Sequence, residues 1–350
     1  MTLLYTGTYT APPLGRARGI GIYEYDHATG ELGNHRAVEG VANPSFLAAA
    51  EDDAFIYSVG EGEGGTITAF RRDAATGDLT KLNQQSTGGN GPCYVSIDAT
   101  GRFALVANYG AGSVAALPIA DDGSIGEAAS VVQHEGSGPF EGRQEGPHAH
   151  MIAPTPDGRF VIATDLGADE VITYRLSDDG QLERVSAMKT APGAGPRHFA
   201  FAPNGATAYV INELDNTLLT CDYNAATGRL ETRQTISTLP EGYDEESYCA
   251  HVLVSPDGRF VYGSNRGHDS IATFLVMSDT GEVALIGHAP TRGSFPRHFT
   301  LDPDGTRMLV ANQNSDNLIV LARDPETGLL SEENVVEGIP STVCLLFVGD

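Results

Sequence analysis

Apolar residues in this chain occur in many short runs that are separated by glycine-containing turns. Segments such as FVYGSNR (260–266) and TRMLVANQ (306–313) are short and rich in residues that favour β-strands. No stretch of ten or more residues has its apolar positions at the spacing of an amphipathic helix. The pattern therefore predicts an all-β protein built from many short strands.

The turns recur at a regular interval along the chain. The sequences ATGRF, PDGRF, PNGAT, PDGRF and PDGTR share a turn glycine, and Asp53 takes the same place in AEDDAF; the glycines are Gly101, Gly158, Gly205, Gly258 and Gly305. Successive anchors are 48, 57, 47, 53 and 47 residues apart, which is about one four-stranded propeller blade. A second glycine turn, as in DAATGDL, NAATGRL and DPETGLL, completes the four-stranded pattern of the unit.

Six anchors predict six blades, and the two ends of the chain predict a seventh. The N-terminal segment from LLYTGTYT to ATGEL supplies three strands, and IPSTVCLLFV near the C-terminus supplies the fourth. Pairing of these segments would close the ring and remove exposed sheet edges. We therefore expect a seven-bladed β-propeller that forms one domain over residues 1–350. The alternative is an open β-solenoid, which would carry polar capping repeats at its ends.

The charge of the chain limits the kinds of partner. The 350 residues carry a formal net charge of −25, and Lys81 and Lys189 are the only lysines. An acidic surface repels phosphate backbones, so we expect no nucleic-acid partner. No apolar stretch approaches the ~20 residues of a membrane span, and the N-terminus lacks the basic region of a signal peptide. We expect a soluble cytoplasmic protein, a monomer or weak homo-oligomer, without a membrane partner.

Cysteine spacing and carboxylate distribution argue against a bound metal. The four cysteines show no CxxC spacing, which fits a reduced intracellular protein better than a disulfide framework or a zinc site; they are Cys93, Cys221, Cys249 and Cys344. No cluster of Glu, Asn and Asp has the character of a hard-cation site. We therefore expect neither a metal nor a cofactor.

The repeat also predicts where functional side chains gather. The strand before each anchor should be the innermost strand of its blade, and antiparallel pairing brings residues equally far before and after the turn close together. Eight residues before the anchors lie Ser45, Cys93, His150, Arg197, Ala250 and Arg297. Eight residues after them lie Glu61, Tyr109, Leu166, Glu213, Arg266 and Gln313. We expect these side chains to ring one mouth of the central channel.

Imidazoles add to this set from two directions. The next position along the inner strands holds Met151, His198, His251 and His298. The unit with the longest spacing contains an extra segment, 133–150, whose glycines and prolines are typical of a rim loop. That loop supplies His134, Arg143, Gln144 and His148. His27, His35 and His288, in contrast, resemble surface positions.

Several guanidinium groups at one opening favour an anionic ligand. A buried Arg is costly unless it meets a carboxylate or an anion, and Glu213 could neutralise only one of its neighbours. Arg binds carboxylates and phosphates through two parallel hydrogen bonds. A lone Arg or His in a propeller strand is more often a structural ion pair or a satisfied core group. The strand-end asparagines are more often turn residues than ligands; they are Asn108, Asn212, Asn265 and Asn312. The convergence of many such groups is what points to function.

Long strings of the chain resemble a known family. They are GTYT (7–10), NPSFLA (43–48), VANYGAGSVA (106–115), QHEGSG (133–138), RQEGPHAH (143–150), GAGPRHFAF (193–201), NELDNT (212–217), STLPEGY (237–243), SNRGHDSIA (264–272) and VANQNSDN (310–317). Together they resemble the seven-bladed lactonases, the propeller-type 6-phosphogluconolactonase family, which also contains a fungal carboxy-muconate lactonising enzyme. The resemblance implies metal-independent hydrolysis of a small anionic phosphosugar lactone, 6-phosphoglucono-1,5-lactone, in the pentose phosphate pathway.

The resemblance carries site residues onto this chain. The implied catalytic residues are His148, His150, Arg197, Glu213 and Arg266. We expect substrate-binding roles for Arg297, Arg143, Gln144, His198, His251, Gln313 and Tyr109. Two positions depart from the family pattern, because His251 replaces an acidic residue and His298 stands where Asp or Asn is common. Both changes lower the negative charge near the mouth.

A lactone hydrolase needs an activated water and a stabilised oxyanion. We expect His148 or His150 to be the base, because a neighbouring Arg197 would lower the pKa of the other candidate, Glu213. Arg197 and Arg266 would face the developing alkoxide, and Arg297 with Arg143 would hold the phosphate. Two alternatives stay open: a lactonising or delactonising enzyme acting on a carboxy-muconate dicarboxylate, and a non-catalytic propeller that binds protein partners.

Overall fold

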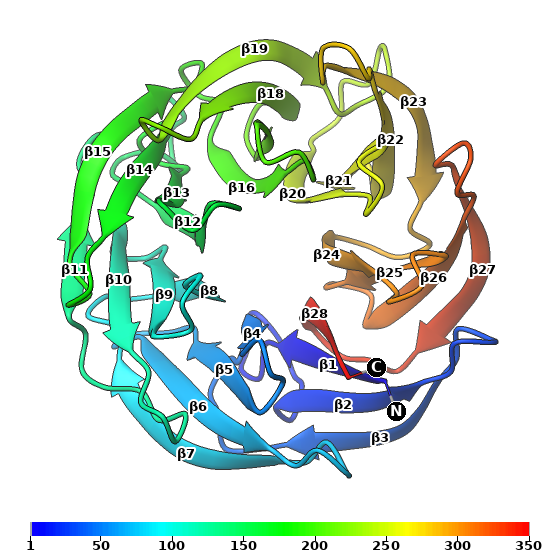
Figure 1. The fold of residues 1–350 in the computed structure, drawn as a ribbon. Coiled ribbons are helices and arrows are strands. Elements are labelled where there is room, and N and C mark those ends of the chain that lie inside the picture. Colours follow the sequence, from blue (N-terminus) through cyan, green and yellow to red (C-terminus); the bar gives the residue numbers. More distant parts are fainter. Residues whose placement is uncertain (1, 350) are drawn as a thin grey trace.

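The strands form a closed ring of seven antiparallel sheets with four strands each (Figure 1). A computed structural model describes residues 2–349. The strands in chain order are β1 (Leu3–Thr8), β2 (Ile20–Tyr25), β3 (Leu32–Val38), β4 (Leu47–Ala49), β5 (Phe55–Gly60), β6 (Thr66–Arg72), β7 (Leu79–Ser86), β8 (Pro92–Ile97), β9 (Phe103–Asn108), β10 (Ser113–Pro118), β11 (Ser130–Gln133), β12 (Ala149–Pro154), β13 (Val161–Asp165) and β14 (Glu170–Leu176). They continue as β15 (Leu182–Lys189), β16 (Pro196–Phe201), β17 (Thr207–Asn212), β18 (Thr217–Asn224), β19 (Arg229–Ser237), β20 (Tyr248–Val254), β21 (Phe260–Arg266), β22 (Ser270–Val276), β23 (Val283–Pro290), β24 (Pro296–Leu301), β25 (Arg307–Asn312), β26 (Asn317–Arg323), β27 (Leu330–Glu337) and β28 (Thr342–Val348). The predicted seven-bladed propeller is confirmed.

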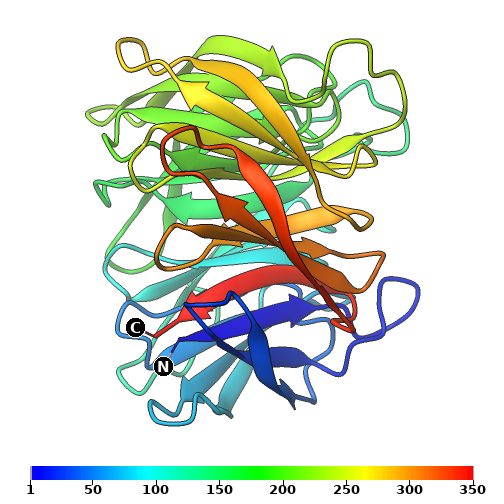
Figure 2. The same ribbon diagram turned by 90° about the vertical axis from the view of Figure 1, so that its right-hand side faces the viewer.

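The two ends of the chain close the ring, as predicted. Strand β28 is the innermost strand of a sheet whose other three strands are β1, β2 and β3. It pairs antiparallel with β1, so that Tyr5 lies opposite Leu346. The two termini consequently lie side by side (Figures 1 and 2). An open solenoid is thereby excluded. Within residues 2–349, no helix has the length and apolar character needed to cross a bilayer.

A repeated tyrosine contact joins neighbouring blades and explains the second glycine turn. The hydroxyl groups of Tyr5, Tyr209 and Tyr262 each donate a hydrogen bond to the carbonyl of a turn glycine in the next blade, at 2.6, 2.8 and 2.9 Å; the glycines are Gly77, Gly281 and Gly328. Each of these glycines has φ between 71° and 73°, in the left-handed region that glycine enters at little cost. The turn therefore supplies a hydrogen-bond acceptor for the hydroxyl of a tyrosine that is buried between sheets.

The inner strands contain a β-bulge that the sequence pattern did not reveal. We expected Arg197 to lie opposite Glu213, but the ladder pairs Pro196 with Asn212 and His198 with Ile211, so that Arg197 is the bulged residue. The same irregularity occurs on β8, β12, β20 and β24. A bulge changes the direction of the side chains around it. Consecutive residues of one strand, such as Arg197 and His198, can therefore both face the channel.

Candidate active site

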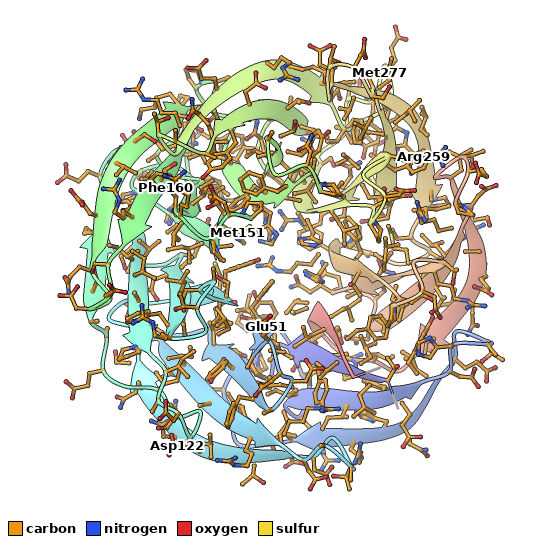
Figure 3. All side chains as sticks on the ribbon, viewed as in Figure 1. Glu51, Asp122, Met151, Phe160, Arg259 and Met277 are labelled. Carbon is orange, nitrogen blue, oxygen red and sulfur yellow. The ribbon has the colours of Figure 1, made fainter. Side chains whose placement is uncertain are left out.

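A cavity of about 260 Å³ lies at one end of the channel, where the inner strands meet the loops that carry Leu14, Arg143 and Phe295. Side chains project into the opening that the ribbon leaves at the centre of the ring (Figure 3). Seven of the twelve predicted site residues line this cavity: Tyr109, Arg143, His150, Glu213, Arg266, Arg297 and Gln313. Two more, Arg197 and His198, line a narrow extension of about 10 Å³ below it. The repeat therefore brings most of the predicted set to one place.

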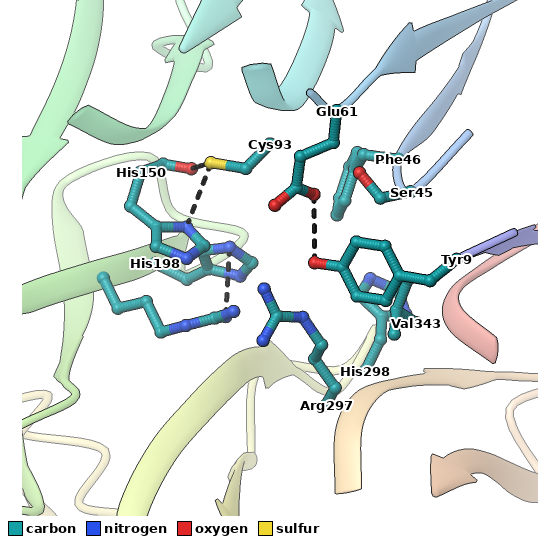
Figure 4. Close-up of a pocket in the computed structure, with 11 residues that line it drawn as sticks. Tyr9, Ser45, Phe46, Glu61, Cys93, His150, His198, Arg297, His298 and Val343 are labelled. Carbon is teal, nitrogen blue, oxygen red and sulfur yellow. Dashed lines mark hydrogen bonds between the residues drawn. The ribbon is translucent and has the colours of Figure 1, made fainter. Parts of the chain in front are cut away.

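Five residues line both the cavity and its extension: Tyr9, Glu61, Cys93, His150 and Arg297. Because these residues line both spaces, they form the neck between them; Figure 4 draws all five among the residues that line the extension. The hydroxyl of Tyr9 donates a hydrogen bond of 3.0 Å to Oε2 of Glu61, and the sulfur of Cys93 lies 3.8 Å from Nδ1 of His150. A small molecule in the neck would thus meet a carboxylate, an imidazole and a guanidinium.

Glu213 is the centre of an arginine cluster. Its Oε2 lies 2.8 Å from both Nε of Arg197 and Nη2 of Arg266, and its Oε1 pairs with Arg143 from the rim loop. Burial alone would raise the pKa of Glu213, but the guanidinium groups of Arg266, Arg197 and Arg143 outweigh burial and hold it well below its usual value. Glu213 is therefore ionised, and both of its oxygens are paired with arginines, so its carboxylate holds three guanidinium groups in place.

Arg197 is held from several sides at the bottom of the cluster. It is 2% exposed, and its Nη1 donates hydrogen bonds to the carbonyl oxygen of Ala250 at 2.6 Å and to Nε2 of His198 at 3.3 Å. Burial and the nearby charges of Arg266 and Arg297 lower its pKa to about 9. Burial is the largest cause of this lowered pKa, and the two neighbouring guanidinium groups add to it.

Arg297 differs from the other arginines of the site. Among the residues that the structure describes, no hydrogen bond or ion pair engages its guanidinium, which lies 5.7 Å from the ring centre of Tyr9. It lines both the cavity and the extension. An Arg with its whole donor fork directed at a cavity is suited to bind a carboxylate or phosphate.

His150 is the imidazole in the neck. It is 4% exposed, and burial, with Arg197 as the next cause, lowers its pKa well below the usual value. The imidazole is therefore neutral at neutral pH and keeps a nitrogen lone pair, and the same burial makes it a weaker base than an exposed histidine.

A row of three further imidazoles lies below His150, and their hydrogen bonds define their tautomers. Arg197 must donate to Nε2 of His198, so Nδ1 of His198 carries the proton and donates to Nδ1 of His251 at 2.9 Å. The ring of His251 stacks on His298 with 4.1 Å between centroids, and Nδ1 of His298 accepts from the backbone N–H of Leu345. His251 lines neither space and supports His198 instead.

Besides His251, two predicted site residues, His148 and Gln144, line neither space. His148 precedes β12; it stacks on Tyr109 with 4.5 Å between centroids and donates from Nδ1 to the carbonyl of Tyr109 at 2.9 Å. Gln144 is fully buried, and its amide donates to Leu166 and Asp169, which anchors the rim loop next to Arg143. Both residues therefore support the wall of the site and do not face its interior.

Several cavity residues were not among the predicted site residues. Tyr9, Glu61, Tyr248, Phe295 and Leu14 all line the cavity. Glu61 stands at the predicted position eight residues after Asp53, and Tyr9 lies in the motif GTYT, so both had a signal in the sequence. The positions eight residues from each turn include neither Leu14 nor Phe295, which belong to loops.

The titratable groups of the site do not form a metal-binding arrangement. Within the described residues 2–349, no group of three or more His, Cys, Asp or Glu side chains is placed to hold a metal ion. The arrangement that is present, cationic with a neutral imidazole at its neck, is suited to bind an anion and to transfer a proton.

Comparisons with known proteins agree over the whole chain. The family model described as Lactonase, 7-bladed beta-propeller, matches residues 3–347. A 6-phosphogluconolactonase of Bacillus subtilis (strain 168) is 39% identical over 345 residues, covering 98% of this chain and 97% of the relative. A 6-phosphogluconolactonase of Formosa agariphila is 35% identical over 351 residues, with coverage of 97% and 98%. The solved structure of a periplasmic gluconolactonase from Pseudomonas aeruginosa is similar with a TM-score of 0.94 and 34% identity, over 99% of both chains.

Proposed function

The chain belongs to the seven-bladed β-propeller lactonase family and is a lactonase, and on this premise we propose that its substrate is 6-phospho-D-glucono-1,5-lactone. The product would be 6-phospho-D-gluconate, as in the pentose phosphate pathway. We propose further that the reaction takes place in the cavity at the end of the channel. Two relatives that cover nearly the whole chain carry the name 6-phosphogluconolactonase, which supports the phosphorylated substrate.

The free guanidinium of Arg297 carries this proposal. The cavity and its extension hold four arginines, Arg143, Arg197, Arg266 and Arg297, against two carboxylates, so four minus two leaves a formal excess of two positive charges. This excess lies within a protein of net charge −25. Three of the arginines are engaged by Glu213, whereas Arg297 has its donors available. A phosphate dianion bound at Arg297 would balance the excess.

His150 acts as the general base in this proposal. The neutral imidazole accepts a proton from water as the water oxygen attacks the lactone carbonyl carbon. Arg197 or Arg266, both fixed by Glu213, stabilises the negative charge that develops on the carbonyl oxygen. When the bond to the ring oxygen breaks, the imidazolium returns its proton to that oxygen. The acid product then loses one proton to solvent, and His150 is neutral again.

Metal independence and a cytoplasmic location belong to the same proposal. The absence of a metal-binding group of side chains among residues 2–349 supports a reaction without a metal. All four cysteines are free thiols, which supports a reducing compartment. Activity that survives EDTA would agree with the first statement, and loss of activity that Zn²⁺ or Mg²⁺ restores would contradict it.

The test compares lactones that differ in charge. We expect the purified protein to hydrolyse 6-phosphogluconolactone, after subtraction of spontaneous opening, with a higher kcat/KM than either D-glucono-1,5-lactone or a carboxy-muconolactone. Arg297→Gln should raise KM for the phosphorylated lactone by about 10- to 100-fold, because it removes a charge-assisted hydrogen-bond pair. The same variant should leave kinetics with the unphosphorylated lactone nearly unchanged. Equal effects on both substrates would contradict phosphate binding at Arg297. A higher kcat/KM with the carboxy-muconolactone would contradict the proposed substrate and identify the dicarboxylate lactone in its place.

A further inference from the structure

We infer that Phe295 is a positioning residue for Arg266, kept in an unfavourable backbone conformation because its ring holds that guanidinium in place. The inference rests on the proposed function only in giving Arg266 a part in the reaction. Phe295 lies directly before Pro296, the first residue of β24.

The inner strands of three blades begin in the same way, which makes Phe295 comparable with two glycines. Gly91, Gly195 and Phe295 each precede a proline that starts an inner strand. Their carbonyl oxygens accept backbone hydrogen bonds from equivalent residues, Tyr109, Glu213 and Gln313, at 2.8, 2.7 and 3.1 Å. The backbone N–H groups of Gly195 and Phe295 also donate to equivalent aspartates, Asp169 and Asp269, both at 2.8 Å.

The shared conformation suits glycine and disfavours phenylalanine. The φ angles are 59° at Gly91, 65° at Gly195 and 70° at Phe295, all in the left-handed region. A residue with a Cβ atom meets steric repulsion there, and a bulky aromatic residue enters this region rarely. Two repeats therefore have glycine, which adopts this conformation without strain. The third repeat has phenylalanine and keeps its side chain although the backbone is strained. Strain of this kind that persists at a cavity points to a function for the side chain.

The function follows from what the ring touches. The Phe295 ring lines the cavity, and Cζ of Arg266 lies 5.0 Å from its centre, within the range of a cation–π interaction. The other contacts of Arg266 are in-plane hydrogen bonds to Glu213 and to the carbonyls of Tyr248 and Cys249. These bonds engage the N–H groups of the guanidinium, and its central carbon lies over the ring of Phe295. Without the ring, water could take its place and the guanidinium could tilt away from the reacting carbonyl.

Phe295 and Arg266 come from neighbouring blades, so the contact also sets their relative position at the cavity. Arg266 ends β21, and Phe295 lies in the loop before β24. Phe295 is only half-buried, so removing its ring takes little from the core. Glycine at this position should therefore relieve the backbone strain and raise the stability of the fold, while it lowers kcat. These opposite signs separate a positioning role from a structural one.

The experiment uses three variants of Phe295 and one control. Phe295→Gly and Phe295→Ala both remove the ring, but only glycine relieves the left-handed backbone. We expect kcat to fall about 10-fold or more in both variants, with KM changed less, because phosphate binding is assigned to Arg297. We expect the urea midpoint of the glycine variant to lie above that of the alanine variant. Phe295→Tyr keeps an aromatic face and should retain most of the kcat.

The matched control is Arg292→Gly, in the same loop. Arg292 also has a left-handed φ, 50°, but its side chain is exposed and pairs with Glu332 on the surface. This variant should gain stability without any loss of kcat. Wild-type kcat in Phe295→Gly would overturn the inference, as would a tyrosine variant as slow as the glycine variant.

Failure of the proposed function would look different. In that case the wild-type protein would not hydrolyse 6-phosphogluconolactone, and another lactone that it does hydrolyse would serve for the comparison. If no lactone is hydrolysed, crystal structures of wild type and Phe295→Gly decide. Displacement of the Arg266 guanidinium from Glu213 in the variant supports the positioning role, and an unchanged guanidinium overturns it.

Discussion

Acid should weaken this fold strongly, because imidazoles beneath the cavity are held uncharged. His150, His198 and His298 are 4, 2 and 7% exposed. Burial is the largest cause of a lowered pKa in all three, followed by the charge of Arg197, and the pKa of His298 falls to about 3. In the unfolded chain each imidazole would regain a pKa near ~6.5. Unfolding below that pH therefore takes up protons that the folded protein does not bind.

The size of the effect follows from proton linkage. A group whose folded pKa is lowered binds its proton only after unfolding, so stability is full above ~pH 6.5 and falls as the pH drops. At about pH 5.5 one such imidazole lowers the free energy of unfolding by about 1.4 kcal/mol, and the three together by about 4 kcal/mol. Glu213 stays ionised throughout this range, because its arginine partners lower its pKa. The loss would be a large part of the stability of about 5–15 kcal/mol that a domain commonly has.

The assay is urea unfolding at about pH 7.5, 6.5 and 5.5 in one buffer ionic strength. His298→Asn is the informative variant, because the asparagine carbonyl can still accept the hydrogen bond from the backbone of Leu345. It should remove about 1.4 kcal/mol of the loss at pH 5.5 and leave the other imidazoles as they are. Equal wild-type stability at pH 7.5 and 5.5 would refute the reasoning, and so would an unchanged pH dependence in the variant.

Three further predictions concern the arginine cluster and its supports. Glu213→Gln should lower the free energy of unfolding by about 3–5 kcal/mol, because it leaves buried guanidinium groups without their counter-charge. Urea unfolding at neutral pH measures this, and a variant as stable as wild type would contradict the role of Glu213 as that counter-charge. The kcat/KM of the wild-type enzyme should stay level as the pH falls through ~6.5 and decline only in more acidic buffer, because burial lowers the pKa of His150. A fall of kcat/KM centred on about pH 6.5 would exclude His150 as the base. Gln144→Ala should raise KM more than it lowers kcat, because it frees the loop that carries Arg143, and steady-state kinetics that match wild type would show that the loop needs no such anchor.

The architecture could be predicted from the sequence because it depends on local chemistry that repeats. Turn glycines such as Gly205 and Gly258 mark the hairpins, and the chain ends LLYTGTYT and IPSTVCLLFV contain complementary parts of one sheet. The same hairpin symmetry indicated that Arg197 and Glu213 would meet, which their 2.8 Å ion pair confirms. Contacts between residues that a repeat relates could therefore be predicted from the sequence.

The rest depended on backbone irregularities that leave no clear trace in the sequence. His148 and His150 are two residues apart and would share a face in a regular strand. However, β12 begins at Ala149 and contains a bulge at His150, so that only His150 reaches the cavity. Likewise, Arg143 joins the Glu213 cluster from a loop whose path the repeat does not define. The glycine-to-phenylalanine change at 295 was visible in FPRH, but its meaning required the backbone angle.

The most direct test of the site is a crystal structure of the protein with 6-phosphogluconate. We predict that the product lies in the cavity with its phosphate on the guanidinium of Arg297 and its carboxylate beside Arg266 and His150. Product bound elsewhere on the ring, or bound in the cavity without contact to Arg297 and His150, would contradict the account.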